Sequence, residues 1–173
     1  MNSPADAAHD KITEAPEQST APAPRRDPAL GPDISLALGP MLAASILTPL
    51  GVGLVAWPLL GLINPDSIGV IPRAMISVAA VFAGTTLMIQ PWKTRPVTQW
   101  LHWWLGVLGA CFFGTVAIAL VLLYSAPPEE RAALGVLIAV GHFATLMAAS
   151  FVVASLVRKG YDTAVAGPAQ GAG

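Results

Sequence analysis

The charged residues of this 173-residue chain avoid four long apolar segments. All nine Lys and Arg and all ten Asp and Glu lie outside Ile34–Ile63, Ala74–Gln90, Val97–Tyr124 and Ala132–Val157. A charge at the centre of a lipid bilayer costs about 2.5–3.5 kcal/mol, and about 17–25 apolar residues cross the hydrocarbon as one helix. We therefore predict an all-α integral membrane protein with four transmembrane helices in a small bundle.

The same pattern divides the chain into three parts. The transmembrane domain covers residues 34–159, with predicted spans at about 36–62, 73–90, 98–124 and 132–157. Residues 1–33 mix prolines, small residues and charges of both signs, which predicts a disordered cytoplasmic tail. Residues 160–173 predict a second, flexible tail. The first apolar run follows six acidic residues and is about twice as long as a signal-peptide core, so we expect it to be retained.

Prolines mark the expected helix ends, with one exception. Pro72 suits the first turn of the second helix, and Pro91 ends that helix. Pro49 lies at the centre of the first span, where it removes a backbone hydrogen bond and is expected to kink the helix. A broken helix can line a transport path, although a kink without any ligand is the plainer interpretation.

Lysines and arginines near the span ends predict the orientation. Six of them lie in the two tails and the central loop, which share one side: Arg25, Arg26, Lys93, Arg95, Arg158 and Lys159. Only Arg73 and Arg131 lie on the other side. This excess predicts cytoplasmic termini, in a bacterial inner membrane.

Aromatic side chains mark the predicted membrane interfaces. We assign interfacial anchoring in lipid to one set on the inner side: Trp92, Lys93, Arg95, Trp100, Trp103 and Trp104. Some of these residues, together with His102, also suit an anionic lipid headgroup, but generic anchoring predicts the same positions. On the outer side, solvated helix caps explain a second charged group: Asp66, Arg73, Glu129, Glu130 and Arg131.

Composition and motifs exclude several functions. Hydrophobic residues make up 54% of the chain and the formal net charge is −1, which argues against a nucleic-acid partner. The single cysteine, Cys111, supports neither a disulfide framework nor a thiol metal site. The motifs of metalloproteases, serine hydrolases, phosphate-binding loops and dinucleotide-binding folds are missing. We therefore expect a non-enzymatic protein without a metal or cofactor.

Small residues at four-residue spacing indicate where helices pack. Membrane helices associate through such residues because small side chains let two backbones approach closely. The third span carries one stripe and the fourth carries another: Gly106, Ala110 and Gly114, then Gly141, Thr145 and Ala149. Either stripe suits a neighbouring helix of the same chain or of another subunit.

Two histidines are the polar candidates near or inside the spans. His142 lies near the middle of the fourth span. An ionisable residue at that depth is first considered as a functional residue, because it is costly to keep in hydrocarbon. The alternative is an ordinary packing role, in which a hydroxyl or carbonyl group of another helix hydrogen-bonds the ring. His102 lies at the inner end of the third span.

Haem held by two axial histidines is the sharper hypothesis for this pair. The segment from Arg95 to Trp103, which contains His102, resembles the start of a helix in bacterial cytochrome b561-type proteins. That resemblance implies a haem ligand at His102. The depths of the two histidines differ by about 15 Å at 1.5 Å of rise per residue, so the pair cannot bridge one haem. A haem shared with another subunit remains open.

These observations lead to one expectation and two alternatives. We expect an accessory or assembly subunit of a larger inner-membrane complex, for example an ATP synthase or a respiratory complex. Small four-span accessory proteins of ATP synthases are similar in outline. The first alternative is a small oligomeric transporter or channel that uses the Pro49 kink and His142. The second is a haem-binding electron-transfer subunit.

Overall fold

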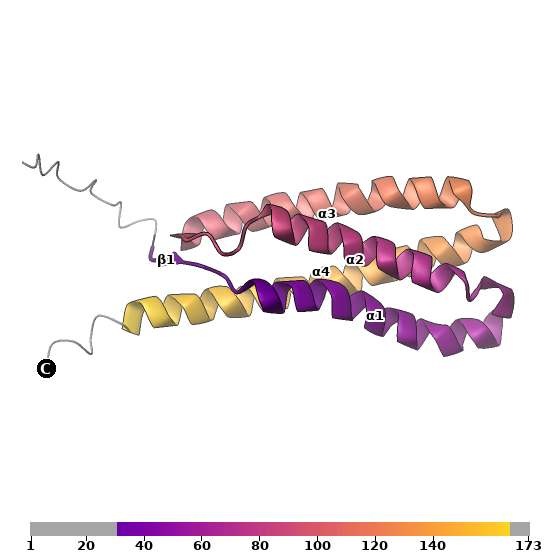
Figure 1. Cartoon of the computed structure of the whole chain (residues 1–173), viewed down its shortest axis with the longest axis horizontal. Coiled ribbons are helices and arrows are strands. Elements are labelled where there is room, and N and C mark those ends of the chain that lie inside the picture. Colours follow the sequence, from indigo (N-terminus) through magenta and orange to yellow (C-terminus); the bar gives the residue numbers. More distant parts are fainter. Residues whose placement is uncertain (1–30, 167–173) are drawn as a thin grey trace, which may run out of the picture.

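The computed structural model describes residues 31–166, and four long helices dominate that part of the chain. They are α1 (Leu38–Ile63), α2 (Val70–Met88), α3 (Val97–Ser125) and α4 (Pro128–Ala166). The helices lie side by side along the long axis of the molecule (Figure 1). Each is long and apolar enough to cross a membrane, so the prediction of four such segments is confirmed and fits a multi-pass membrane protein. Of the predicted disordered tail over residues 1–33, residues 1–30 lie outside the described residues, whereas Asp33 belongs to a short strand and corrects the prediction there.

The helix ends follow local sequence signals. α1 continues through both Pro49 and Pro58 and ends beside a short 3-10 turn, η2 (Pro65–Ser67). α2 begins three residues earlier than predicted, which places Pro72 in its first turn, as expected. It ends at Met88, and Gln90 then adopts a left-handed conformation with a φ of 53°. Such a residue commonly follows a helix end, because it turns the chain away from the helix axis.

Helix α4 is longer than the sequence suggested. It runs to Ala166, so the prediction of a flexible tail is wrong for residues 160–166, while residues 167–173 lie outside the described part. Gly160 does not end the helix, because Ile34 packs directly against it in the space that a side chain would occupy. A Cβ built at Gly160 would lie 3.2 Å from the Cβ of Ile34. Ala164 also packs against the core, which further supports the last turns.

Two short strands accompany the four helices. β1 (Asp33–Ile34) pairs antiparallel with β2 (Arg95–Pro96), and Ile34 lies opposite Arg95. The indole Nε1 of Trp100 donates a hydrogen bond to the carbonyl oxygen of Ile34 at 3.0 Å. We call this end of the bundle the strand end. It also holds the α2–α3 loop and the last turns of α4 (Figure 1).

The core lies between α2 and α4, because each of these helices contacts the other three. Buried side chains of α2 include Ala74, Met75 and Val78, which contribute to one continuous apolar cluster. Large apolar side chains also cover the outside of the bundle, and Leu54 and Phe113 are 76% and 71% exposed. Apolar surface on this scale is unusual for a soluble monomer. It suits a molecule surrounded by hydrocarbon.

Candidate functional site

Small polar side chains join successive helices inside the bundle. Between α1 and α2, Ser45 donates to the carbonyl oxygen of Met41 at 2.9 Å, and its Oγ lies 3.3 Å from Thr86 Oγ1. Between α2 and α3, Thr85 Oγ1 lies 3.0 Å from Cys111 Sγ. Each hydroxyl is therefore satisfied within the protein, which matters where no water can replace a lost partner.

His142 makes the corresponding contact between α3 and α4. The residue is only 5% exposed, and its Nδ1 forms a 2.9 Å hydrogen bond with Thr115 Oγ1. Three aromatic rings surround it, with centroids 5.3–6.4 Å away: Phe82, Phe112 and Phe143. This arrangement is the cross-helix hydrogen bond that the packing interpretation of His142 requires.

The two histidines lie in different places. His102 is exposed near the start of α3, and its Nδ1 is 2.9 Å from the carbonyl oxygen of Thr98, within its own helix. It lines a groove between α2 and α3, whereas His142 lines a hollow of about 200 Å³ between α3 and α4. The structure therefore does not gather the two imidazoles into one site. This separation agrees with the difference in depth that the sequence indicates.

The groove between α2 and α3 holds part of the predicted small-residue stripe. Its volume is about 440 Å³, and Gly106 and Ala110 form part of its wall. Both residues are exposed, and an added Cβ at Gly106 would meet nothing within 4 Å. Only Gly114 of this stripe packs internally, because its added Cβ would lie 3.2 Å from Val81. Within the described part of the chain, most of the stripe on α3 therefore has no packing partner.

The stripe on α4 lies inside the bundle. Gly141, Thr145 and Ala149 are all buried. An added Cβ at Gly141 would lie 3.1 Å from the Cε of Met75, and one at Gly53 of α1 would lie 3.0 Å from its Cγ. Met75 therefore fits between two glycines on different helices. Gly53 follows Pro49 by four residues on the same buried face of α1.

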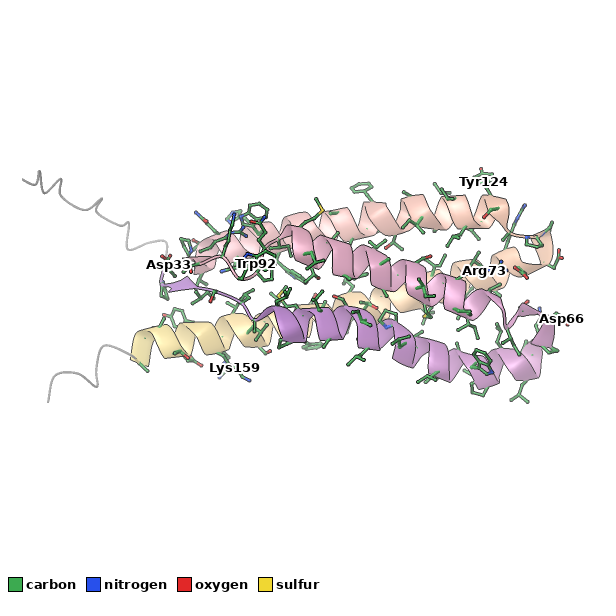
Figure 2. All side chains as sticks on the ribbon, viewed as in Figure 1. Asp33, Asp66, Arg73, Trp92, Tyr124 and Lys159 are labelled. Atoms are coloured by element: carbon green, nitrogen blue, oxygen red, sulfur yellow. The ribbon has the colours of Figure 1, made fainter. Side chains whose placement is uncertain are left out.

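The predicted interfacial set gathers at the strand end. The guanidinium carbon of Arg95 lies 4.3 Å from the ring centre of Trp103 and 5.2 Å from that of Trp100. These distances are typical of cation–π contacts. Trp92 and Lys93 are exposed, and Trp104 is half-buried. Figure 2 shows Trp92 at the strand end and Tyr124 at the opposite end.

The second charged group lies at the opposite end but forms only one ion pair among the described residues. Arg73 Nη1 lies 3.4 Å from Glu130 Oε2, which joins the start of α2 to the start of α4. Arg131 donates from Nε to the carbonyl oxygen of Ala126 at 3.1 Å. Asp66 and Glu129 are exposed. Within residues 31–166, no three His, Cys, Asp or Glu side chains gather closely enough to hold a metal ion.

Comparisons with known proteins identify no relative. No family model, no curated protein and no solved structure matches this chain.

Proposed function

We propose that this protein is a non-enzymatic accessory or assembly subunit of a larger complex in a bacterial inner membrane, with both termini in the cytoplasm. One observation carries the proposal. The groove between α2 and α3 exposes Gly106 and Ala110, and no side chain of residues 31–166 fills the space above Gly106. A stripe of small residues allows another helix to approach closely. The proposed partner therefore places a transmembrane helix in this groove.

The contrast with three other glycines of the bundle supports this assignment. Gly53 and Gly141 receive Met75, and Gly114 receives Val81, so internal packing accounts for these three glycines. Among residues 31–166, Gly106 has no such neighbour. The groove wall is almost entirely apolar, which suits van der Waals packing against a helix better than it suits a polar substrate.

The interior gives less support to the transport alternative. From Val70 to Val78, every buried residue of α2 is apolar, and so are the buried residues of α4 from Leu134 to Ile138. The polar contacts of Ser45, Cys111 and His142 lie beyond this apolar stretch, toward the strand end. A solute path across the membrane would need polar groups or water along its whole length.

The test enlarges the small residues and measures assembly. The full chain is tagged at its C-terminus in its own cells, extracted in mild detergent and sized on a native gel. We expect the wild-type chain to migrate with a larger complex. Gly106→Leu and Ala110→Leu should shift most of it, about tenfold or more, to the position of the isolated chain.

A matched variant serves as the control. Ala43 is an exposed alanine of α1, and Ala43→Leu adds the same bulk as Ala110→Leu at a position outside the α2–α3 groove. This variant should remain in the complex. A wild-type chain that always migrates alone would contradict the proposed function. Equal losses in Ala43→Leu and Ala110→Leu would show that the groove is not the docking site.

A further inference from the structure

A second groove lies at the strand end, between α3 and α4. Its volume is about 510 Å³, and its walls include Trp100 and Trp104 from α3 and Val153, Val157 and Arg158 from α4. On α4 the lining extends from Ser150 to Tyr161, which is about 16 Å at 1.5 Å of rise per residue. The groove is therefore long and mainly apolar.

The depth of this groove matches one leaflet of a membrane. The hydrocarbon core of a bilayer is about 30 Å thick, so one leaflet contributes about 15 Å. Tyr161 and Arg158 lie at the strand end of the groove, whereas Ser150 lies toward the middle of the bundle. Tryptophan and tyrosine favour the level of the lipid headgroups. The aromatic residues thus place the mouth of the groove at the interface and its floor in the hydrocarbon.

The mouth of the groove carries the positive charge of Arg158, which can bind an anionic group. Arg158 is exposed and forms no hydrogen bond or ion pair with any residue from 31 to 166. Among the described residues, the strand end carries four basic side chains and two acidic ones: Lys93, Arg95, Arg158 and Lys159, and Asp33 and Asp162. Guanidinium groups bind phosphate well, because their donors match two phosphate oxygens at once.

We propose that this groove binds one anionic phospholipid of the strand-end leaflet. An acyl chain lies in the apolar groove between α3 and α4, and the headgroup phosphate contacts Arg158. A transmembrane helix fits less well, because the bulky rings of Trp100 and Trp104 form the α3 wall opposite Ala154, and because such a helix would remove Arg158 from water. The site rests on the membrane placement in the proposed function, but it does not depend on the partner complex.

Native mass spectrometry of the purified full chain tests this site. The protein is delipidated in detergent and mixed with phosphatidylglycerol or phosphatidylcholine with identical acyl chains. We expect phosphatidylglycerol to be retained at least about fivefold more strongly, the effect of one basic residue near an anionic headgroup. Arg158→Gln should remove this preference. Lys159→Gln, which removes the same charge one residue away from the lining, should keep it.

A second pair of variants tests the acyl-chain position. Ala154 lines the groove, so Ala154→Phe should fill it and weaken binding of both lipids about fivefold or more. Ala43→Phe, on the exposed face of α1, should leave binding unchanged. Unaltered elution and helical circular dichroism would show that each variant is folded.

Several results would overturn the proposal. They are equal retention of the two lipids by the wild-type chain, equal effects of Arg158→Gln and Lys159→Gln, and wild-type lipid binding by Ala154→Phe. A dimer that Ala154→Phe disrupts, without bound lipid, would instead assign the groove to a second copy of the chain. Because the purified chain is tested alone, these results are independent of assembly through Gly106.

Discussion

Hydrogen bonds between side chains connect the helices in the order α1, α2, α3, α4, with one contact for each successive pair. The contacts are Ser45 with Thr86, Thr85 with Cys111, and Thr115 with His142. A polar group without a partner is costly in hydrocarbon, so these pairs favour one register of neighbouring helices over shifted ones. Their individual contributions to stability are expected to be modest, because the unfolded chain in a membrane also finds partners.

The contact between Thr115 and His142 gives a prediction at this scale. Thr115→Val keeps the shape of the side chain but removes the hydroxyl that bonds to His142 Nδ1. We expect the free energy of unfolding to fall by about 0.6 kcal/mol, and at most about 1.7 kcal/mol, the range for such bonds in membrane proteins. The measurement is reversible unfolding in mixed detergent and sodium dodecyl sulfate micelles.

A matched hydroxyl provides the control for Thr115→Val. Ser155 is exposed and donates only to the carbonyl oxygen of Val152 in its own helix. Ser155→Ala should change the stability by less than about 0.5 kcal/mol. If both variants lost the same stability, the contact with His142 would have no special role. A double-mutant cycle with His142→Phe isolates the pairwise contribution.

At the scale of elements, the close approach of α1, α2 and α4 depends on Gly53 and Gly141. Gly53→Leu places a large side chain where even a Cβ would lie 3.0 Å from Met75 Cγ. Overpacking of this kind typically costs about 1–3 kcal/mol, and we expect a loss of stability in that range in the same micelle assay. Gly106→Leu adds the same side chain at a position without a neighbour within 4 Å, so it should cost far less.

A second substitution separates steric pressure from other effects of Gly53→Leu. Met75→Ala shortens the side chain that lies between the two glycines. In the Gly53→Leu background it should restore part of the lost stability, whereas alone it should be destabilising because it leaves a cavity. Strictly additive losses would contradict the contact between Gly53 and Met75.

The helices could be predicted from the sequence because charged residues are costly in hydrocarbon. Their absence therefore marks each membrane-spanning segment directly in the sequence. The face of each helix that points inward could not be predicted from the sequence. Gly106 and Gly141 belong to similar stripes, yet one is exposed and the other is buried. The choice depends on which neighbours supply a matching side chain, as Met75 does for Gly141. The pairing of Ile34 with Arg95 also depends on distant residues, and two-residue strands leave no periodic pattern.

The candidate sites, too, could be predicted only in part from the sequence. The sequence alone indicated a hydrogen-bonded role for His142 as one alternative, because a buried imidazole in an apolar helix needs a partner. It did not indicate that Thr115 would be that partner, or that Arg158 would line a groove between α3 and α4. Both depend on the rotation of α3 against α4, which follows from packing of the whole bundle.

For the molecule as a whole, the arrangement of its two ends predicts the topology. The α2–α3 loop and the end of α4 share the strand end, and Figure 2 shows Asp66 at the opposite end, away from Lys159. In a Cys111→Ala background, single cysteines at Lys93 and Lys159 should react with an impermeant thiol reagent from the cytoplasmic side. A cysteine at Asp66 should react from the other side.

The labelling experiment includes its own checks. Permeabilised membranes should make all three cysteines reactive, which shows that each is exposed. Labelling of the Lys93 and Asp66 positions from the same side would rule out a single membrane crossing by α2. Labelling of Lys93 from the non-cytoplasmic side alone would reverse the proposed orientation without changing the number of spans.

The continuous course of α4 has a practical consequence. The helix contains 39 residues, which corresponds to about 58 Å and exceeds the hydrocarbon thickness of about 30 Å. Ile34 packs against Gly160 and Ala164 packs against the core, so α4 continues as one helix to Ala166. A soluble helical protein spliced in register after Ala166 would therefore inherit the orientation of the bundle. Such a fusion gives electron cryo-microscopy a fiducial mark for a particle that is otherwise hidden in its micelle.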